Sequence, residues 1–117
     1  MVFMASSGEL LPGTLDVLIL KTLSWGPRHG YAVARWLEDT TDEALAIEEG
    51  SLYPALYRME RKGWIEAEWG TSELGRKAKF YALTGAGRGR LDHEVLAWKR
   101  LSSAVTKVLG VSAARAG

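Results

Sequence analysis

Residues 48–65 read EEGSLYPALYRMERKGWI, and this stretch decides the fold. Its apolar residues recur at i, i+3, i+4 and i+7, which predicts a helix with one buried face. These residues are Leu52, Ala55, Leu56 and Met59. A second face is aromatic and cationic, and it contains Pro54, Tyr57, Arg58 and Arg61. A helix held on a core by one side, with arginine and tyrosine on the other, is typical of a helix that enters the major groove of DNA.

Two further helices are expected before this one. They lie at residues 14–24 and 30–39, between breakers and capping residues. The inner face of the second helix is expected to contain Tyr31, Ala34 and Leu37. Residues 40–49 form a polar, acidic connector with room for one extra turn, and Gly63 ends the third helix as its C-cap.

Two strands follow, at residues 64–69 and 78–83, with a loop at residues 70–77 that has adjacent cations at its exit. In the first strand the apolar and acidic residues alternate. Ile65, Ala67 and Trp69 lie on one side, and Glu66 and Glu68 on the other. Three helices followed by a hairpin with a basic tip predict a winged helix-turn-helix in the mainly α (α+β) class.

The last predicted element is a long helix over residues 85–110, N-capped by Thr84. Its apolar residues recur at steps of three and four. They are Leu91, Val95, Trp98, Leu101, Val105 and Val108. Because this stripe is longer than the other three helices can cover, we expect it to form the interface of a homodimer. A helix that folds back on its own domain is the alternative.

Length and charge are consistent with one DNA-binding domain. The 117 residues divide into a disordered segment 1–9, a domain at 10–84, the helix at 85–110 and a flexible tail at 111–117. The net charge is only +1, but residues 28–49 carry two cations against six acids. Residues 51–90 carry eight cations against four acids, which is the pattern of a local basic surface.

Several classes of function are excluded by what the sequence lacks. It has no cysteine, and His29 and His93 are too far apart for a metal site, so no metal or cofactor is expected. No nucleophile with its base and no phosphate-binding glycine loop suggests an enzyme. The longest apolar run, residues 17–20, is too short to cross a membrane, and a cytoplasmic protein is expected. His29 is expected to form a hydrogen bond near the turn between the first two helices.

The remaining tryptophans are expected in the core or in strands. They are Trp25, Trp36, Trp64 and Trp69.

The order and spacing of several motifs resemble the PadR family of transcriptional regulators, in its short class with a single C-terminal helix. The motifs are GTLD at 13–16, LIL at 18–20, HGY at 29–31, EGSLYPAL at 49–56, Glu60, KGWI at 62–65, RKAK at 76–79, Tyr81, Leu83, Thr84 and Gly87. The resemblance covers nearly everything from residue 13 to residue 109. It implies a homodimeric bacterial repressor that binds palindromic promoter DNA.

The resemblance also implies roles for individual residues. Ser51, Tyr53 and Pro54 open the recognition helix, and Arg76, Lys77 and Lys79 form a basic wing. Arg58 and Arg61 are candidates for guanine edges or phosphates, the two wing lysines for phosphates, and Arg76 for the minor groove. Tyr53 either donates its hydroxyl to a phosphate or packs under the wing. For each single cation, a solvated surface position is the alternative.

Three points stay open at the level of sequence. The wing carries Glu73, Leu74 and Gly75 where polar or basic residues are expected. Trp98 is expected in the dimer core, with stacking on a flat effector, as in some multidrug-sensing relatives, as the alternative. The competing function is a winged helix that binds only other proteins, because this fold also serves in protein complexes.

Overall fold

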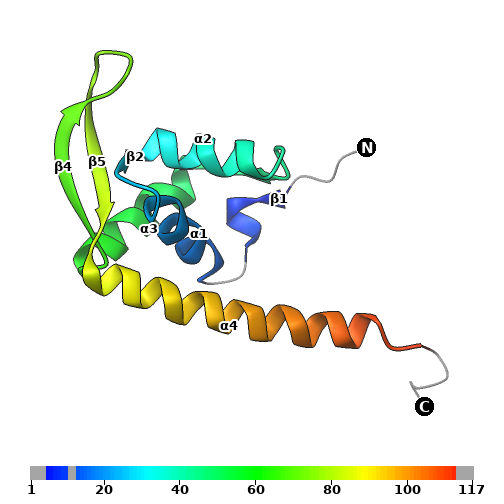
Figure 1. Cartoon of the computed structure of the whole chain (residues 1–117). Helices are drawn as coiled ribbons and strands as arrows, with labels where there is room; N and C mark the ends of the chain where they lie inside the picture. The colour runs from blue at the N-terminus through cyan, green and yellow to red at the C-terminus, as the bar shows by residue number, and fades with distance from the viewer. Residues whose placement is uncertain (1–4, 11–12, 113–117) are drawn as a thin grey trace.

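Helices α1, α2 and α3 pack around one core, a small sheet lies against them, and α4 leads away (Figure 1). The computed structural model describes residues 5–10 and 13–112. In chain order the elements are β1 (Ala5–Ser6), the 3-10 helix η1 (Ser7–Glu9), α1 (Thr14–Leu23), β2 (Arg28–His29), α2 (Gly30–Thr40), β3 (Leu45–Ala46), α3 (Glu49–Arg61), β4 (Ile65–Thr71), β5 (Lys77–Leu83) and α4 (Gly85–Leu109). This order confirms the predicted winged helix-turn-helix.

The apolar face of α3 is buried as its periodicity predicts. Leu52, Ala55, Leu56 and Met59 are each at most 3% exposed, and they contact the inward faces of α1 and α2. The main residues on those faces are Ile19, Leu20, Leu23, Val33 and Leu37. Burial of one large aliphatic side chain contributes about 1.5–3 kcal/mol, so the position of α3 is set chiefly by this face.

The prediction for two aromatic residues is wrong. Tyr31 was expected on the inner face of α2, but it is 61% exposed, because Gly30, Val33 and Leu37 occupy the inward positions of that helix. Trp25 was expected in the core or in a strand, but it lies in the turn after α1 and is 65% exposed. The Nζ atom of Lys21 lies 4.8 Å from the centroid of its ring.

The N-terminal segment is ordered where the sequence suggested disorder. Strand β1 pairs in parallel with β3, and Ser7 is buried beneath the start of α3. The hydroxyl of Ser7 accepts a hydrogen bond of 2.9 Å from the backbone N–H of Glu48. The prediction of disorder over residues 1–9 is therefore wrong for residues 5–9; residues 1–4, and residues 113–117 of the predicted tail, lie outside the described residues.

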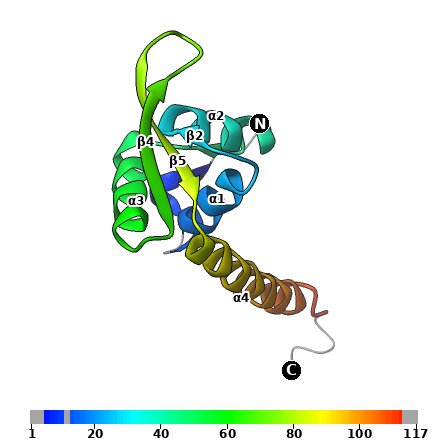
Figure 2. The same ribbon diagram turned by 60° about the vertical axis from the view of Figure 1, so that its left-hand side comes forward.

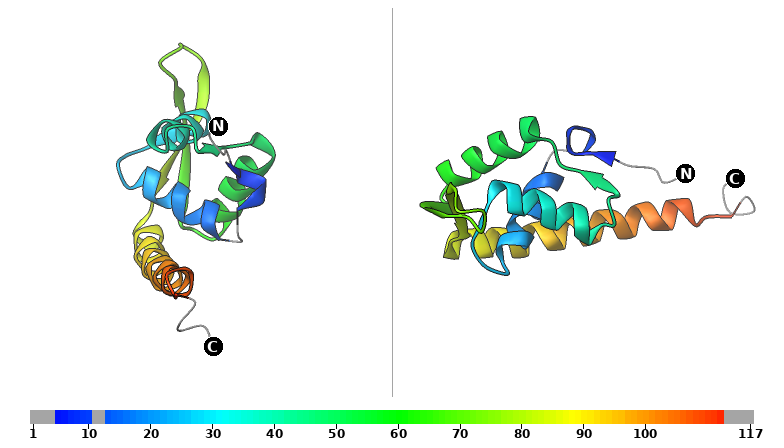
Figure 3. Two further views of the ribbon diagram at one scale, coloured as in Figure 1. Left: turned by 90° about the vertical axis from the view of Figure 1, so that its right-hand side faces the viewer. Right: turned by 90° about the horizontal axis from the view of Figure 1, so that it is seen from above.

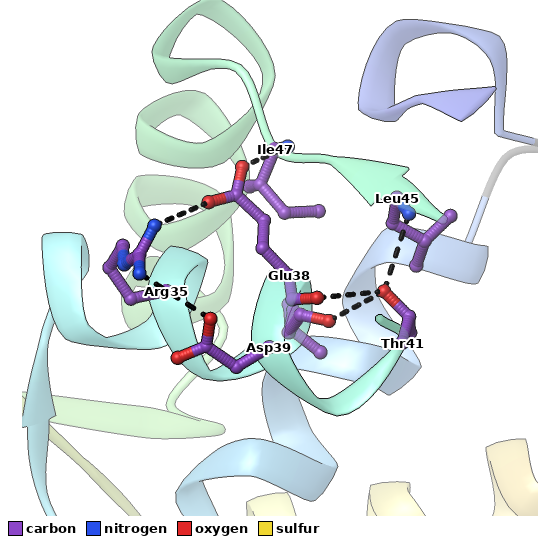
Figure 4. Close-up of polar contacts among 7 residues, drawn as sticks. Arg35, Glu38, Asp39, Thr41, Leu45 and Ile47 are labelled. Carbon is purple, nitrogen blue, oxygen red and sulfur yellow. Dashed lines mark hydrogen bonds and ion pairs between the residues drawn. The ribbon is translucent and has the colours of Figure 1, made fainter. Parts of the chain in front are cut away.

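The acidic connector between α2 and α3 is held by side-chain contacts to the end of α2 (Figure 4). Glu38 accepts a hydrogen bond of 3.0 Å from the backbone N–H of Ile47 and lies 4.0 Å from Arg35. The hydroxyl of Thr41 donates to the carbonyl of Leu37 at 2.9 Å and accepts from the N–H of Leu45 at 3.3 Å. These contacts allow a sharp turn and the short strand β3, where the sequence left room only for an extra helical turn.

Strands β4 and β5 form the predicted hairpin, and its loop projects beyond the helices (Figure 2). The pairing runs from Ile65 opposite Leu83 to Thr71 opposite Lys77, which leaves a short loop at residues 72–76. One side of the hairpin continues the core, because Ile65 and Tyr81 are buried there. The same side carries Trp69, Lys77 and Lys79 further out, since side chains alternate along a strand.

Helix α4 begins on the core and ends beyond the other elements (Figure 3). The hydroxyl of Thr84 accepts a hydrogen bond of 3.0 Å from the N–H of Gly87, which confirms the predicted N-cap. Leu91 was expected in a dimer interface, but it is buried in the core of its own chain at 6% exposure, and Val95 packs beside it. The stripe becomes exposed from Trp98 onward.

Two glycines in the first turns of α4 should respond to alanine in opposite ways. A Cβ added at Gly87 would lie 1.9 Å from the carbonyl oxygen of Trp64, whereas a Cβ added at Gly89 would have no atom within 4 Å. Gly87→Ala should lower the free energy of unfolding by about 2 kcal/mol or more, because backbone atoms must move. Gly89→Ala should raise it by up to about 1 kcal/mol, as in other exposed helices. Urea denaturation measures both, and equal effects at the two positions would contradict the close contact.

Candidate nucleic-acid interface

The outward face of α3 presents an aromatic and a cationic side chain together. Tyr57 and Arg61 are both exposed, and the guanidinium carbon of Arg61 lies 5.7 Å from the centroid of the Tyr57 ring. Pro54 is also exposed on this helix, whereas Ser51 in its first turn is half-buried. Arg58 is exposed at its edge, but its Nη2 atom lies 2.5 Å from a carboxylate oxygen of Asp16 in α1. These five predicted residues of α3 therefore have different surroundings.

Tyr53 lies where α3 meets the start of α2. A Cβ added at Gly30 would lie 2.8 Å from a ring carbon of Tyr53 and 3.0 Å from its hydroxyl oxygen, so the ring would have to shift to admit any other residue there. The ring thus packs on the first residue of α2, and it remains partly exposed toward the hairpin. In this position the hydroxyl of Tyr53 can contact a ligand that lies between α3 and the hairpin.

The wing cations are placed by contacts with α3 and with the hairpin itself. The Nζ atom of Lys79 lies 3.1 Å from a carboxylate oxygen of Glu60, and this hydrogen bond raises the pKa of Lys79. The Nζ atom of Lys77 lies 5.2 Å from the centroid of the Trp69 ring on the neighbouring strand. Arg76 is in the loop, where its backbone N–H donates to the hydroxyl of Ser72 at 3.3 Å. The lysines are therefore preoriented, not freely solvated.

A groove of about 650 Å³ separates the hairpin from the starts of α2 and α3. Its walls combine aromatic rings with cations. They include Tyr31, Tyr53, Trp69, Arg76, Lys77 and Lys79. Tyr81 also lines the groove, and burial raises the pKa of its phenol, so this side chain is neutral at physiological pH. Rings beside cations in one concave surface suit a polyanion that carries planar groups.

A contact between Glu73 and His29 ties the hairpin loop to α2. The Nδ1 atom of His29 accepts a hydrogen bond of 3.2 Å from the N–H of Ala32 and so caps α2, which confirms the hydrogen bond predicted at this turn. Because Nδ1 accepts this hydrogen bond, Nε2 is the ring nitrogen that bears a hydrogen, and it lies 3.5 Å from the carboxylate of Glu73. A backbone hydrogen bond, together with this contact, lowers the pKa of Glu73.

The structure adds residues that the sequence reading did not assign to the interface. Tyr31, His29 and Trp69 line the groove together with the predicted Tyr53, Arg76, Lys77 and Lys79. Tyr31 and His29 belong to the HGY motif that supports the family resemblance, but the sequence predicted Tyr31 on the inner face of α2 and only a hydrogen bond at the turn for His29. The exposure of Trp69 had no signal either, since alternation alone assigns it to the same side as the buried Ile65.

A second groove, of about 510 Å³, lies between α1 and α4. Its lining is mainly apolar and includes Val17 and Leu18 from α1 and Leu91, Val95 and Trp98 from α4. Beyond it the stripe continues with exposed apolar side chains. They are Leu101, Val105 and Val108. This surface is distant in sequence from the aromatic and cationic groove and differs from it in chemistry.

Comparison with known proteins identifies the family. A profile of the transcriptional regulator PadR-like family matches residues 19–93. The chain belongs to the PadR family. A PadR-like transcriptional regulator from Bacillus cereus has a similar structure, with a TM-score of 0.73 and 31% identity, over 86% of this chain and 95% of that one.

Two curated relatives share the sequence over most of this chain. "Uncharacterized protein X" of Lysinibacillus sphaericus is 30% identical over 97 residues, which cover 83% of this chain and 89% of the relative. A 37.1 kDa protein in transposon TN4556 of Streptomyces fradiae is 39% identical over 90 residues. Those residues cover 77% of this chain but only 24% of the Streptomyces protein.

Membership in this PadR family settles the general class of function. PadR-like proteins are DNA-binding transcriptional regulators and not enzymes, so this chain is a transcriptional regulator. No group of three or more metal-binding side chains occurs in the described part of the chain. None of the helices in residues 5–10 and 13–112 is long and apolar enough to span a membrane.

The contact between Glu73 and His29 should restrict the motion of the hairpin loop. In the variant Glu73→Ala, the backbone amides of Gly75 and Arg76 should exchange with solvent a few-fold faster, because the loop loses its tie to α2. A backbone hydrogen bond and the contact with His29 lower the pKa of Glu73 in the folded protein, so both should contribute above the usual Glu titration range and be lost as pH falls through that lowered value.

The matched control is Glu68→Ala, an exposed acid on the same hairpin. Hydrogen exchange followed by NMR reports each amide. Unchanged exchange at both loop amides in Glu73→Ala would show that the contact does not hold the loop.

Proposed function

We propose that this PadR-family chain is a homodimeric repressor that binds a palindromic promoter site. In this proposal α3 enters the major groove and the hairpin loop contacts the flanking backbone, as in other winged helices. The observation that carries it is that α3 and the hairpin both present cations beside aromatic rings. Tyr57 and Arg61 face outward from α3, and Arg76 and Lys77 of the hairpin line the groove that Tyr53 of α3 also lines.

Phosphate contacts fit the cations of the hairpin, and base contacts fit α3. Phosphates accept hydrogen bonds from cations without regard to sequence, whereas base edges in the major groove require planar or hydrogen-bonding side chains at fixed positions. Lys77 and Lys79 stand on a strand at the rim of the groove, where a phosphate backbone could pass. Arg61 and Tyr57 lie on a helix, which fits the width of the major groove.

The exposed half of α4 supports a dimer. Trp98, Leu101, Val105 and Val108 are each at least 46% exposed, on one stripe that continues the apolar groove between α1 and α4. Contiguous apolar surface of this kind marks an interaction site in soluble proteins. A second copy of α4 has the matching apolar stripe, and a two-fold axis would present two α3 helices to a site with the same symmetry.

Selection of bound sequences from a random duplex library should enrich a palindrome. Two copies of α3 related by a two-fold axis read two half-sites about one helical turn apart, or a multiple of that distance. Lys77→Gln should weaken binding to all sequences alike, because a phosphate contact carries no sequence information. Lys107→Gln, on the distal part of α4, should leave binding unchanged.

Expression of a reporter gene placed behind the enriched site should fall when the protein is produced. Activation of that gene would contradict repression. Weak binding without any enriched sequence would contradict the proposal as a whole and favour a winged helix that binds other proteins.

A charge on the exposed stripe should separate the subunits. Leu101→Glu would bury a carboxylate in the proposed interface, so the variant should be a monomer of 12.8 kDa. The wild-type protein should be a dimer of twice that mass. Ser103→Glu adds the same charge on another face of α4, away from the stripe, and should leave the mass unchanged. Sedimentation velocity measures both. A dimer that survives Leu101→Glu would place the interface elsewhere.

Trp98 belongs to this interface in the proposal, and binding of a flat aromatic effector is the alternative role for it. Its side chain lines the groove between α1 and α4 and is 46% exposed. An effector in that groove would contact the tryptophan ring and change its fluorescence in the dimer, whereas pure dimer packing predicts a change only on dissociation.

A further inference from the structure

The two arginines at the end of α3 have different surroundings, although the sequence gives them the same role. Successive residues of a helix are rotated by about 100°, so Tyr57 and Arg61 point in directions about 40° apart. Arg58 lies about 100° from Tyr57 and about 160° from Glu60. Because Glu60 pairs with Lys79 of the hairpin, Arg58 is on the flank of α3 that faces away from the hairpin.

On that flank Arg58 is held by Asp16. The two side chains lie 2.5 Å apart and join the first turn of α1 to the last turn of α3 across 42 residues of sequence. The carboxylate of Asp16 is only 15% exposed, so loss of its partner would leave a largely desolvated charge. This contact holds the guanidinium of Arg58 on the flank of α3 next to α1, away from the hairpin.

Arg61 is arranged differently. No ion pair joins it to an acid among the residues that the structure describes, and its guanidinium lies over the exposed ring of Tyr57. This contact places the guanidinium beside the ring without occupying its hydrogen-bond donors. A guanidinium whose donors are not taken up by an acid can present its planar fork to a guanine edge.

We infer that Tyr57 and Arg61 together determine which base sequence is read, and that Arg58 is a positioning residue that holds α3 on α1 through Asp16. This inference rests on the proposed sequence-specific binding of DNA. It divides the predicted arginines into one that reads bases and one that fixes the angle of the reading helix.

Lysine substitution separates the two roles, because lysine keeps the charge but loses the planar fork. Arg58→Lys can re-form the ion pair with Asp16, so it should change affinity less than about three-fold and enrich the same sequence as the wild-type protein. Arg61→Lys should reduce the preference at one or two positions in each half-site by about 10-fold or more. Selection from a random duplex library measures both variants beside the wild type.

Three results would overturn the inference. If Arg58→Lys alters the preference at a position, Arg58 reads that base; if Arg61→Lys leaves every preference intact, Arg61 does not read bases. A wild-type protein that enriches no sequence overturns the proposed function as well, so the two failures are distinguishable.

The positioning role has its own test, which does not need DNA. Arg58→Gln and Asp16→Asn should each lower the melting temperature. The double variant should melt at no lower temperature than the less stable of the two single variants, because both substitutions remove the same contact. Additive losses in this double-mutant cycle would show that the pair does not hold the two helices together.

Discussion

The structure depends on one close backbone contact, where the end of α3, the start of β4 and the start of α4 meet. The carbonyl of Trp64 accepts a hydrogen bond of 3.1 Å from the N–H of Thr84, and the hydroxyl of Thr84 donates to the carbonyl of Gly63 at 2.6 Å. Gly87 then fits against the same Trp64 carbonyl, where no Cβ could be placed. The ring of Trp64 is covered by Lys62 and Arg90, each with its charged group 4.8 Å from the ring centroid. These contacts fix the direction of α4 relative to the helix that carries the candidate reading residues.

Much of the fold could be predicted from the sequence because the strongest signals are local. The spacing of Leu52, Leu56 and Met59 identified the buried face of α3, and alternation in residues 64–69 identified β4. The prediction was wrong where a pattern has more than one solution. Tyr31 follows an apolar periodicity as well as Val33 does, and only the packing of α2 decides between them. Strand β1 is two residues long, and its pairing with β3 has no periodic signal.

The candidate site was predictable in its cations but not in their partners. The types and spacing of Arg58, Arg61, Lys77 and Lys79 indicated a basic surface, and the structure brings the last two to one groove. The acids that pair with these cations could not be identified, because the contacts join residues 19 and 42 positions apart. Glu73 likewise contacts His29, 44 residues earlier in the chain. This contact gives a structural role to an acidic residue in a wing that was expected to be basic.

The paired acids have a consequence for the thermodynamics of DNA binding. Asp16 and Glu60 act as internal counterions for Arg58 and Lys79, so these two cations hold fewer dissolved anions before DNA arrives. Binding that uses Lys79 exchanges one fixed anion for another, and Arg58 stays with Asp16, so fewer ions are released into solution. The logarithm of the affinity should therefore fall with the logarithm of salt concentration less steeply than the number of basic residues at the interface implies. Such a regulator would remain bound to DNA over a wider range of ionic strength than its number of basic residues suggests.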